Sequence, residues 1–315
     1  MKIKIYILVI VCSVLIGDAY AQVRNYATLG VDAGYAALLD NEKAAYPMGG
    51  AASSLSFGYE MQYKRRLLFN VGVSARYAYT MSGVGEQTLP LRMRDTEGEE
   101  FNYNCFFFDG RNRLNSLYVN IPVMIGCQTS KMYFLVGGRL LLDVWSAAKV
   151  STHLTTTASY DRYIGVLEGM EEHQIYTDRY IEVQPASPRF APQLNVCAEI
   201  GWRLEHSIEN VTGFDVEQKK ILYRLGIFAE YGVLDQNRHN AQEPRLSFYD
   251  DGKGLEYNLN HVYNSVDTKN LHLSNLLVGL RFTVLFQIPE RKDCVLCRDE
   301  YSSARHSSGG GRIDK

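Results

Sequence analysis

Apolar and polar residues alternate along several segments of the chain. From Leu55 to Tyr63 every second residue is apolar, and the intervening positions hold serine, glycine, glutamate and glutamine. A period of two is typical of a β-strand with one apolar and one polar face. We expect eight strands with this pattern, over residues 29–37, 55–63, 69–79, 117–126, 134–144, 194–204, 223–231 and 276–286.

The lengths of these strands and of their connections indicate a membrane barrel. Strands of soluble proteins usually have about 5 or 6 residues, whereas a tilted strand needs about 9 to 11 to cross a bilayer. Short or moderate connections at 64–66, 129–131 and 206–220 alternate with long ones at 40–49, 81–114, 150–189 and 234–271. The sequence therefore predicts an all-β fold, an eight-stranded antiparallel transmembrane β-barrel with long extracellular loops and short periplasmic turns.

The polar faces of the predicted strands carry five acids and five arginines. These residues are Asp32, Glu60, Arg76, Arg139, Asp143, Glu199, Arg203, Arg224, Glu230 and Arg281. In a soluble β-sandwich or a lipocalin-like barrel, the alternative folds, such residues would lie on a solvated outer face. In a membrane barrel of eight strands they would fill the narrow lumen and pair with one another. Strand length and the alternation of connections favour the membrane barrel.

The first residues predict export. Lys2 and Lys4 precede an apolar run over residues 5–17, and Ala19 and Ala21 form a small-x-small cleavage pattern. We therefore expect a cleaved signal peptide over residues 1–21, a barrel over 22–289 and a flexible periplasmic tail over 290–315. The expected location is the outer membrane of a Gram-negative bacterium.

The composition bears on the partner and on the fold. The formal net charge of −2 gives no reason to expect a nucleic acid as partner. The 22 tyrosines and 26 glycines suit β-structure with aromatic girdles and close contacts between strands. Outer-membrane lipid is therefore the expected surrounding of the barrel.

Several motifs resemble a known family. The segment LYVNIPVMIG at 117–126, followed by YFLVGGR at 133–139, is similar to the paired fourth and fifth strands of PorT-like outer-membrane β-barrels of Bacteroidota. The segments DRYIG at 161–165, AEYG at 229–232 and VGLRFTVLF at 278–286 resemble later parts of the same barrels. The resemblance implies an outer-membrane barrel and permits a role in assisting secretion. It carries no catalytic residue.

The predicted tail contains the weak candidates for a metal site. Cys294 and Cys297 have the spacing of a zinc knuckle, and His306 is a third possible ligand. A disulfide in the oxidising periplasm is the simpler interpretation. We expect no cofactor.

The sequence does not predict an enzyme. The histidines of the expected mature chain fall mostly in predicted connections, and none shares a local motif with a serine and an aspartate. A structural or interaction barrel is expected, whose loops meet surface or secretion-system proteins. A narrow porin-like channel is the alternative, and an outer-membrane barrel enzyme is a less favoured one.

Overall fold

The computed structural model describes residues 23–41, 45–64, 66–95, 97–162, 164–188, 190–208, 219–236, 246–250, 255–265 and 272–288. The predicted signal peptide and the predicted tail, with Cys294, Cys297 and His306, lie outside the described residues. The side chains of 172, 205–208, 219–220, 246–250, 255–257 and 264 also lie outside them.

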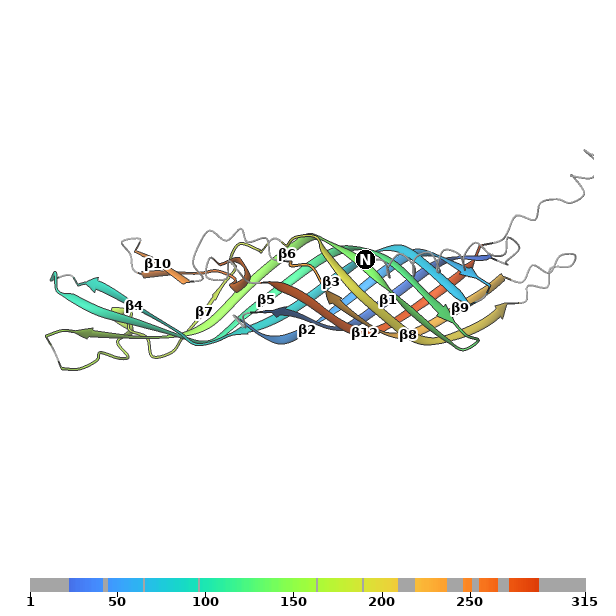
Figure 1. The fold of residues 1–315 in the computed structure, drawn as a ribbon. Coiled ribbons are helices and arrows are strands. Elements are labelled where there is room, and N and C mark those ends of the chain that lie inside the picture. Colours follow the sequence, from blue (N-terminus) through green and yellow to red (C-terminus); the bar gives the residue numbers. More distant parts are fainter. Residues whose placement is uncertain are drawn as a thin grey trace, which may run out of the picture.

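Eight strands close into an antiparallel ring, as the alternation of the sequence predicts (Figure 1). In ring order they are β1 (Val23–Asp40), β2 (Tyr46–Tyr63), β3 (Leu67–Val84), β5 (Glu100–Gln128), β6 (Met132–Tyr160), β8 (Gln193–Ile208), β9 (Lys219–Gly232) and β12 (Leu273–Gln287). The pairing of β1 with β12 closes the ring, with Asp32 directly opposite Arg281. The predicted eight-stranded antiparallel β-barrel is confirmed.

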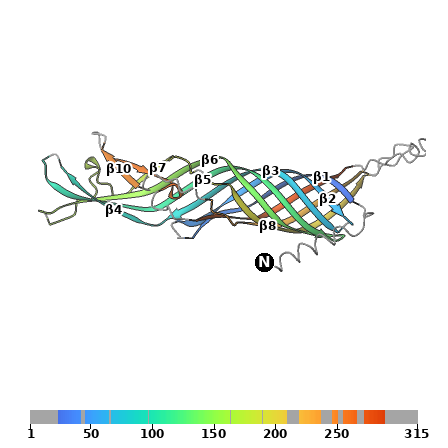
Figure 2. The same cartoon turned by 45° about the horizontal axis from the view of Figure 1, so that its top comes forward.

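The long connections are not simple loops, which corrects one part of the prediction. Residues 81–114 and 150–189 contain β4 (Gln87–Arg94), β7 (Arg179–Val183) and long continuations of β5 and β6. Pairing in the order β4-β5-β6-β7 makes a four-stranded sheet that continues beyond the barrel. We call this sheet, with residues 161–162 and 164–178, the extension (Figures 1 and 2).

Two short strands and two 3-10 turns complete the described structure. β10 (Leu246–Asp250) and β11 (Leu255–Leu259) pair only with each other among the described strands. The turn η1 (Glu171–His173) belongs to the extension, and η2 (Val262–Asn264) lies between β11 and β12.

Two β-bulges interrupt the alternation along β5 and β6. At the first, Leu117 pairs with Trp145 and Tyr118 with Asp143, so that Val144 is an extra residue and both Val144 and Trp145 are exposed. At the second, Asp109 and Gly110 form the longer side, and Asp109 adopts a positive φ of 50°. A bulge bends its strand and changes which residues face inward. These two bulges lie in the region where the ring passes into the extension.

The outer surface of the ring is apolar. Each ring strand presents exposed apolar side chains there, represented in ring order by Val31, Phe57, Val73, Ile125, Val136, Ile200, Ile227 and Leu280. The outward positions within 27–35, 51–59, 69–77, 117–125, 134–144, 194–202, 223–231 and 276–286, all described, hold no Asp, Glu, Lys or Arg. We call this surface the belt. It reverses the arrangement of a soluble barrel, whose apolar residues face inward.

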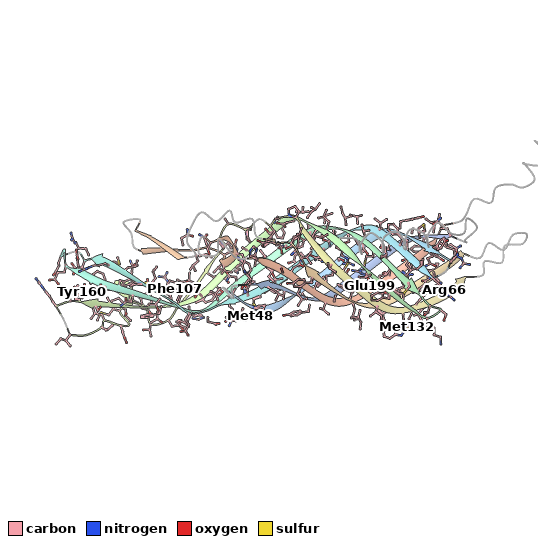
Figure 3. All side chains as sticks on the ribbon, in the orientation of Figure 1. Met48, Arg66, Phe107, Met132, Tyr160 and Glu199 are labelled. Atoms are coloured by element: carbon pink, nitrogen blue, oxygen red, sulfur yellow. The ribbon has the colours of Figure 1, made fainter. Side chains whose placement is uncertain are left out.

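The extension has an apolar core of its own. Tyr103, Phe107 and Leu154 are buried on one face of its sheet, and Ile175 from the chain after β6 packs against them. The hydroxyl of Tyr103 donates to the carbonyl oxygen of Gln174 at 2.5 Å. In Figure 3, Phe107 and Tyr160 lie along the extension, while Arg66 and Met132 lie at the opposite end of the barrel. The extension is thus an ordered continuation of the barrel wall.

Candidate functional site: the lumen network and the closed mouth

Eight charged side chains meet inside the barrel. Seven of the eight ring strands contribute: Asp32 from β1, Glu60 from β2, Arg76 from β3, Arg139 from β6, Glu199 from β8, Arg224 and Glu230 from β9, and Arg281 from β12. All eight are buried, because they occupy the inward positions of strands whose outward positions are apolar. We call this set the lumen network; its four acids and four arginines balance in charge.

Glu230 is the centre of the lumen network. Arg76 donates to both of its carboxylate oxygens, with Nη1–Oε2 at 2.8 Å and Nη2–Oε1 at 2.9 Å. Arg139 Nη1 also donates to Oε1, and Arg281 Nη2 lies 3.9 Å from the same oxygen. A two-pronged guanidinium–carboxylate contact is the strongest geometry for such a pair. One buried carboxylate therefore faces three cations.

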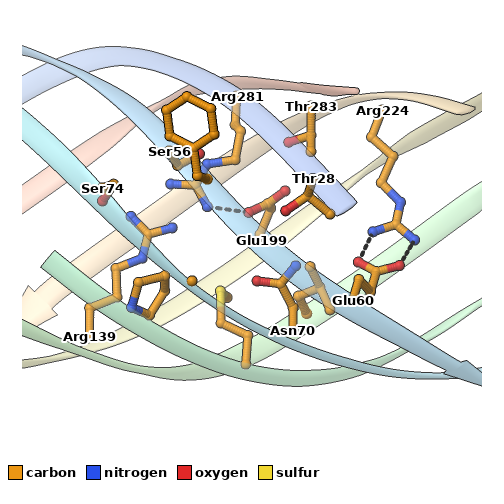
Figure 4. Close-up of a pocket in the computed structure, with 16 residues that line it drawn as sticks. Thr28, Ser56, Glu60, Asn70, Ser74, Arg139, Glu199, Arg224, Arg281 and Thr283 are labelled. Carbon is orange, nitrogen blue, oxygen red and sulfur yellow. Dashed lines mark hydrogen bonds and ion pairs between the residues drawn. The ribbon is translucent and has the colours of Figure 1, made fainter. Parts of the chain in front are cut away.

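Arg281 joins this centre to two further acids. Its Nη2 lies 2.6 Å from Asp32 Oδ2, and its Nη1 lies 2.6 Å from Glu199 Oε2. The hydroxyl of Tyr133 donates to the other oxygen of Glu199 at 2.7 Å. The guanidinium also lies over the ring of Phe228, 4.7 Å from its centroid. The contact of Arg281 with Glu199 is drawn in Figure 4.

A second cluster lies nearer the end of the barrel that carries the turn at residues 129–131, which we call the turn end. Arg224 contacts both carboxylate oxygens of Glu60, with Nη2–Oε1 at 2.8 Å, as Figure 4 shows. Gln128 accepts from Arg224 Nη2 at 3.0 Å and donates to Gln62 at 3.0 Å, and Gln62 donates to Glu60 at 3.1 Å. These four side chains form a closed ring of hydrogen bonds across the lumen.

The cavity among the charged side chains of the lumen is small. A cavity of about 40 Å³ lies among side chains that include Ser56, Asn70, Glu199 and Arg281 (Figure 4). A water molecule needs roughly 10–15 Å³ of such space, so the cavity holds a few waters at most. The side chains of the lumen network occupy the cross-section that a solute would need.

Two of the ten charged residues selected from the sequence do not belong to the lumen network. Asp143 and Arg203 are half-buried, near the two opposite ends of the barrel. Asp143 lies beside the bulge at Val144, and its Oδ2 accepts from the backbone N–H of Phe190 at 3.4 Å. Arg203 lies directly opposite Arg224 across the β8–β9 pair. The alternation gives the correct face for both residues but not their depth in the lumen.

The mouth of the barrel toward the extension is closed by a segment that the sequence did not single out. In residues 260–265, His261, Val262, Tyr263 and Ser265 are buried, and Val262 and Tyr263 pack with Leu38 and Leu114 of the barrel wall. We call residues 260–265 the plug. Because the plug has no regular period, hydrophobic pattern alone does not reveal it.

His261 is held in the plug as a neutral side chain. Its Nδ1 accepts from the backbone N–H of Tyr263 at 3.3 Å, and burial lowers its pKa to about 3. Desolvation disfavours the charged imidazolium, so the ring stays uncharged at physiological pH. The Asn112 side chain accepts from the N–H of Val262 at 3.3 Å, which ties the plug to β5.

Among the described residues, the cysteines and histidines form no group that could hold a metal ion. Cys105, Cys127 and Cys197 are free thiols, and the described residues contain no group of three metal-ligating side chains. His153 Nδ1 lies 2.6 Å from Asp178 Oδ1, a pairing that hydrolytic sites also use. The rings of Phe108 and Tyr180 lie on either side of His153 at 5.5 and 5.4 Å, so aromatic packing also accounts for its position.

Comparison with known proteins adds little to this description. No protein-family model matches the chain, and no curated protein matches it. Among solved structures, the chain is similar to Ail, the attachment invasion locus protein of Yersinia pestis, in complex with the heparin analogue sucrose octasulfate. The two are 8% identical, the match covers 82% of this chain and 98% of that one, and the TM-score is 0.25. So low a likeness supports no further conclusion, and the evidence for the barrel is the strand pairing described above.

In the part of the chain that the structure describes, no helix is long and apolar enough to span a membrane.

Proposed function

We propose that the chain is an integral outer-membrane β-barrel without catalytic activity, which anchors the extension and displays it outside the cell. The observation that carries this proposal is the contrast between the uncharged belt and the buried, charge-balanced lumen. In water, an outer surface of this kind would cost solvation free energy on all sides of the barrel. In a bilayer the belt faces hydrocarbon, and the closed ring leaves no unpaired strand edge there.

The aromatic residues at the ends of the belt support the same proposal. Tyr77, Trp145 and Tyr231 lie on the outer surface toward the mouth, and Tyr59 and Trp202 lie toward the turn end. Along β9, Tyr223 and Tyr231 are eight residues apart, about 27 Å of strand at 3.4 Å per residue. At the usual tilt of about 40° this corresponds to roughly 20 Å along the barrel axis, near the height of an outer-membrane apolar band. Such aromatic girdles mark the two membrane interfaces.

The filled lumen disfavours the narrow porin. Both the lumen network and the plug lie across the path through the barrel, and the cavity between the charged side chains holds only a few waters. Assistance to secretion, which the PorT-like resemblance permits, is a narrower version of the proposal. It would require the extension to contact a protein of the secretion machinery. Export by a cleaved signal peptide over residues 1–21 belongs to the same proposal.

Labelling on intact cells tests the proposal. After replacement of the native cysteines, we expect a membrane-impermeant maleimide to label Thr88→Cys in β4 without permeabilisation. We expect Thr129→Cys, in the turn between β5 and β6, to react only after the outer membrane is permeabilised. Equal labelling of both variants on intact cells would refute the orientation, and labelling of Thr129→Cys alone would invert it.

A further inference from the structure

An apolar cluster lies on the extension near the end farthest from the barrel. Ile164 is fully exposed, and Val166, Leu167 and Met170 are 57, 37 and 41% exposed. We call residues 164–170 the crest. Tyr160, which Figure 3 labels at the far end of the extension, lies four positions before Ile164 in the sequence. Exposed apolar groups that are gathered in one place on a water-facing part mark sites of interaction more often than isolated ones do.

Backbone hydrogen bonds hold the crest at Leu167 and at Met170. Leu167 exchanges two hydrogen bonds with Ala158 of β6, at 2.7 and 3.1 Å. The carbonyl oxygen of Met170 accepts from the N–H groups of His173 and Ile175, at 2.9 and 3.0 Å. Ile175 then turns into the core of the extension, whereas Ile164 and Val166 remain in solvent. A site held in its exposed form loses less conformational freedom when it binds.

The chain segments next to the crest are acidic. Residues 92–100 and 161–172 contain eight acids and three arginines, a net charge of −5. The two segments adjoin, because Arg162 Nη1 lies 2.5 Å from Glu99 Oε1 and Arg92 Nη2 lies 3.7 Å from Asp161 Oδ2. The arginines hold part of this charge in place: Arg94 and Arg92 beside Glu100 lower the pKa of that carboxyl group. The remaining carboxylates give the end of the extension a negative field.

We propose that the crest docks a cationic amphipathic segment of a partner protein, with Ile164 and Val166 against its apolar stripe and Glu168 and Glu171 facing its Lys and Arg side chains. This inference rests on the proposed function, since the extension must lie outside the membrane to meet the partner. The negative charge near the crest favours a cationic partner. An anionic lipid surface or a nucleic acid would be repelled by the same carboxylates. The small apolar area fits a transient contact rather than a permanent one.

A binding measurement with a defined probe tests the inference. The full chain is placed in nanodiscs of zwitterionic lipid and titrated with a synthetic helical peptide that carries leucines on one face and lysines on the other. Binding to empty nanodiscs is subtracted. We expect Ile164→Ser/Val166→Ser to weaken binding by about tenfold or more, and Glu168→Gln/Glu171→Gln to weaken it and to reduce its salt dependence. Phe106→Ser, at an exposed apolar residue of β5, is the matched control and should bind like the unchanged protein.

Each outcome decides between alternatives. Equal affinity of the unchanged protein and the Ile164→Ser/Val166→Ser variant, or no binding at all, overturns the inference. Flotation of the loaded nanodiscs with vesicles of neutral lipid, lost in the same variant, would assign the crest to a lipid surface and would also overturn it. Labelling of Thr88→Cys on intact cells is measured separately. If that labelling succeeds and peptide binding fails, the docking inference is wrong while the proposed function stands.

Discussion

Replacing Glu230 by glutamine will destabilise the barrel by about 3–5 kcal/mol, because it leaves buried arginines without their carboxylate. Arg76 and Arg139 both donate to Glu230, and the side chains of all three are at most 3% exposed. The variant keeps the volume and one acceptor oxygen but changes the charge of the lumen network from balanced to +1. Water cannot reach the arginines freely, so the cost of the uncompensated charge remains in the folded state.

Urea unfolding in lipid vesicles measures this change, with heat-modifiable gel mobility as a check that the variant folds. Glu100→Gln is the matched control, because Glu100 forms ion pairs with Arg92 and Arg94 in the exposed part of the extension. Its stability should equal that of the unchanged protein, since exposed ion pairs contribute little. If Glu230→Gln unfolds at the same urea concentration as Glu100→Gln, the lumen network does not stabilise the barrel.

Replacing Ile227 by arginine will destabilise the barrel by about 2–4 kcal/mol, the cost of a cation near the bilayer midplane. Ile227 is 49% exposed and lies midway along β9 between Tyr223 and Tyr231. An arginine there has no acid within the belt to pair with, because the outward positions of the described belt segments are uncharged. It must either enter hydrocarbon or distort the bilayer.

Val233→Arg is the control for this second prediction. Val233 is also 49% exposed but lies beyond the girdle residue Tyr231, where the cost should fall to about 0–1 kcal/mol. The same unfolding experiment in vesicles compares the two variants. A soluble barrel would show no such difference, because an arginine on a water-facing strand is tolerated at either depth. Equal stability of the two variants would therefore contradict the position of the belt.

The sequence predicts the ring because each of its strands must separate two environments. Along β9, for example, Leu225 and Ile227 face outward while Arg224 and Glu230 face inward, and this alternation is visible without coordinates. The identity of the ion pairs is not visible in the same way. Arg76 and Glu230 are 154 residues apart and meet only because the ring closes. The local sequence pattern shows which side chains point into the lumen, but the closure of the ring decides which of them form ion pairs.

The extension could not be predicted from the same pattern, for two physical reasons. In β5 near residue 106, aromatic residues occupy both faces, with Phe107 buried and Phe106 exposed. Apolar and polar residue types therefore no longer alternate in the sequence there. The bulges at Val144 and at Asp109 then shift the phase between the barrel and the extension. The plug is missed because its burial depends on the barrel mouth that receives it. The crest is visible only once the core of the extension identifies which apolar residues stay outside.

The two tryptophans of the chain allow the most direct test of the belt. Trp145 and Trp202 are both exposed on the outer surface, at the mouth end and the turn end. In vesicles of brominated lipid, we predict strong quenching of both, and of each alone in Trp145→Phe and Trp202→Phe. Bromines near the headgroups should quench more than bromines near the chain ends. Tryptophan fluorescence that no brominated lipid quenches would contradict a lipid-facing belt, and with it the membrane barrel.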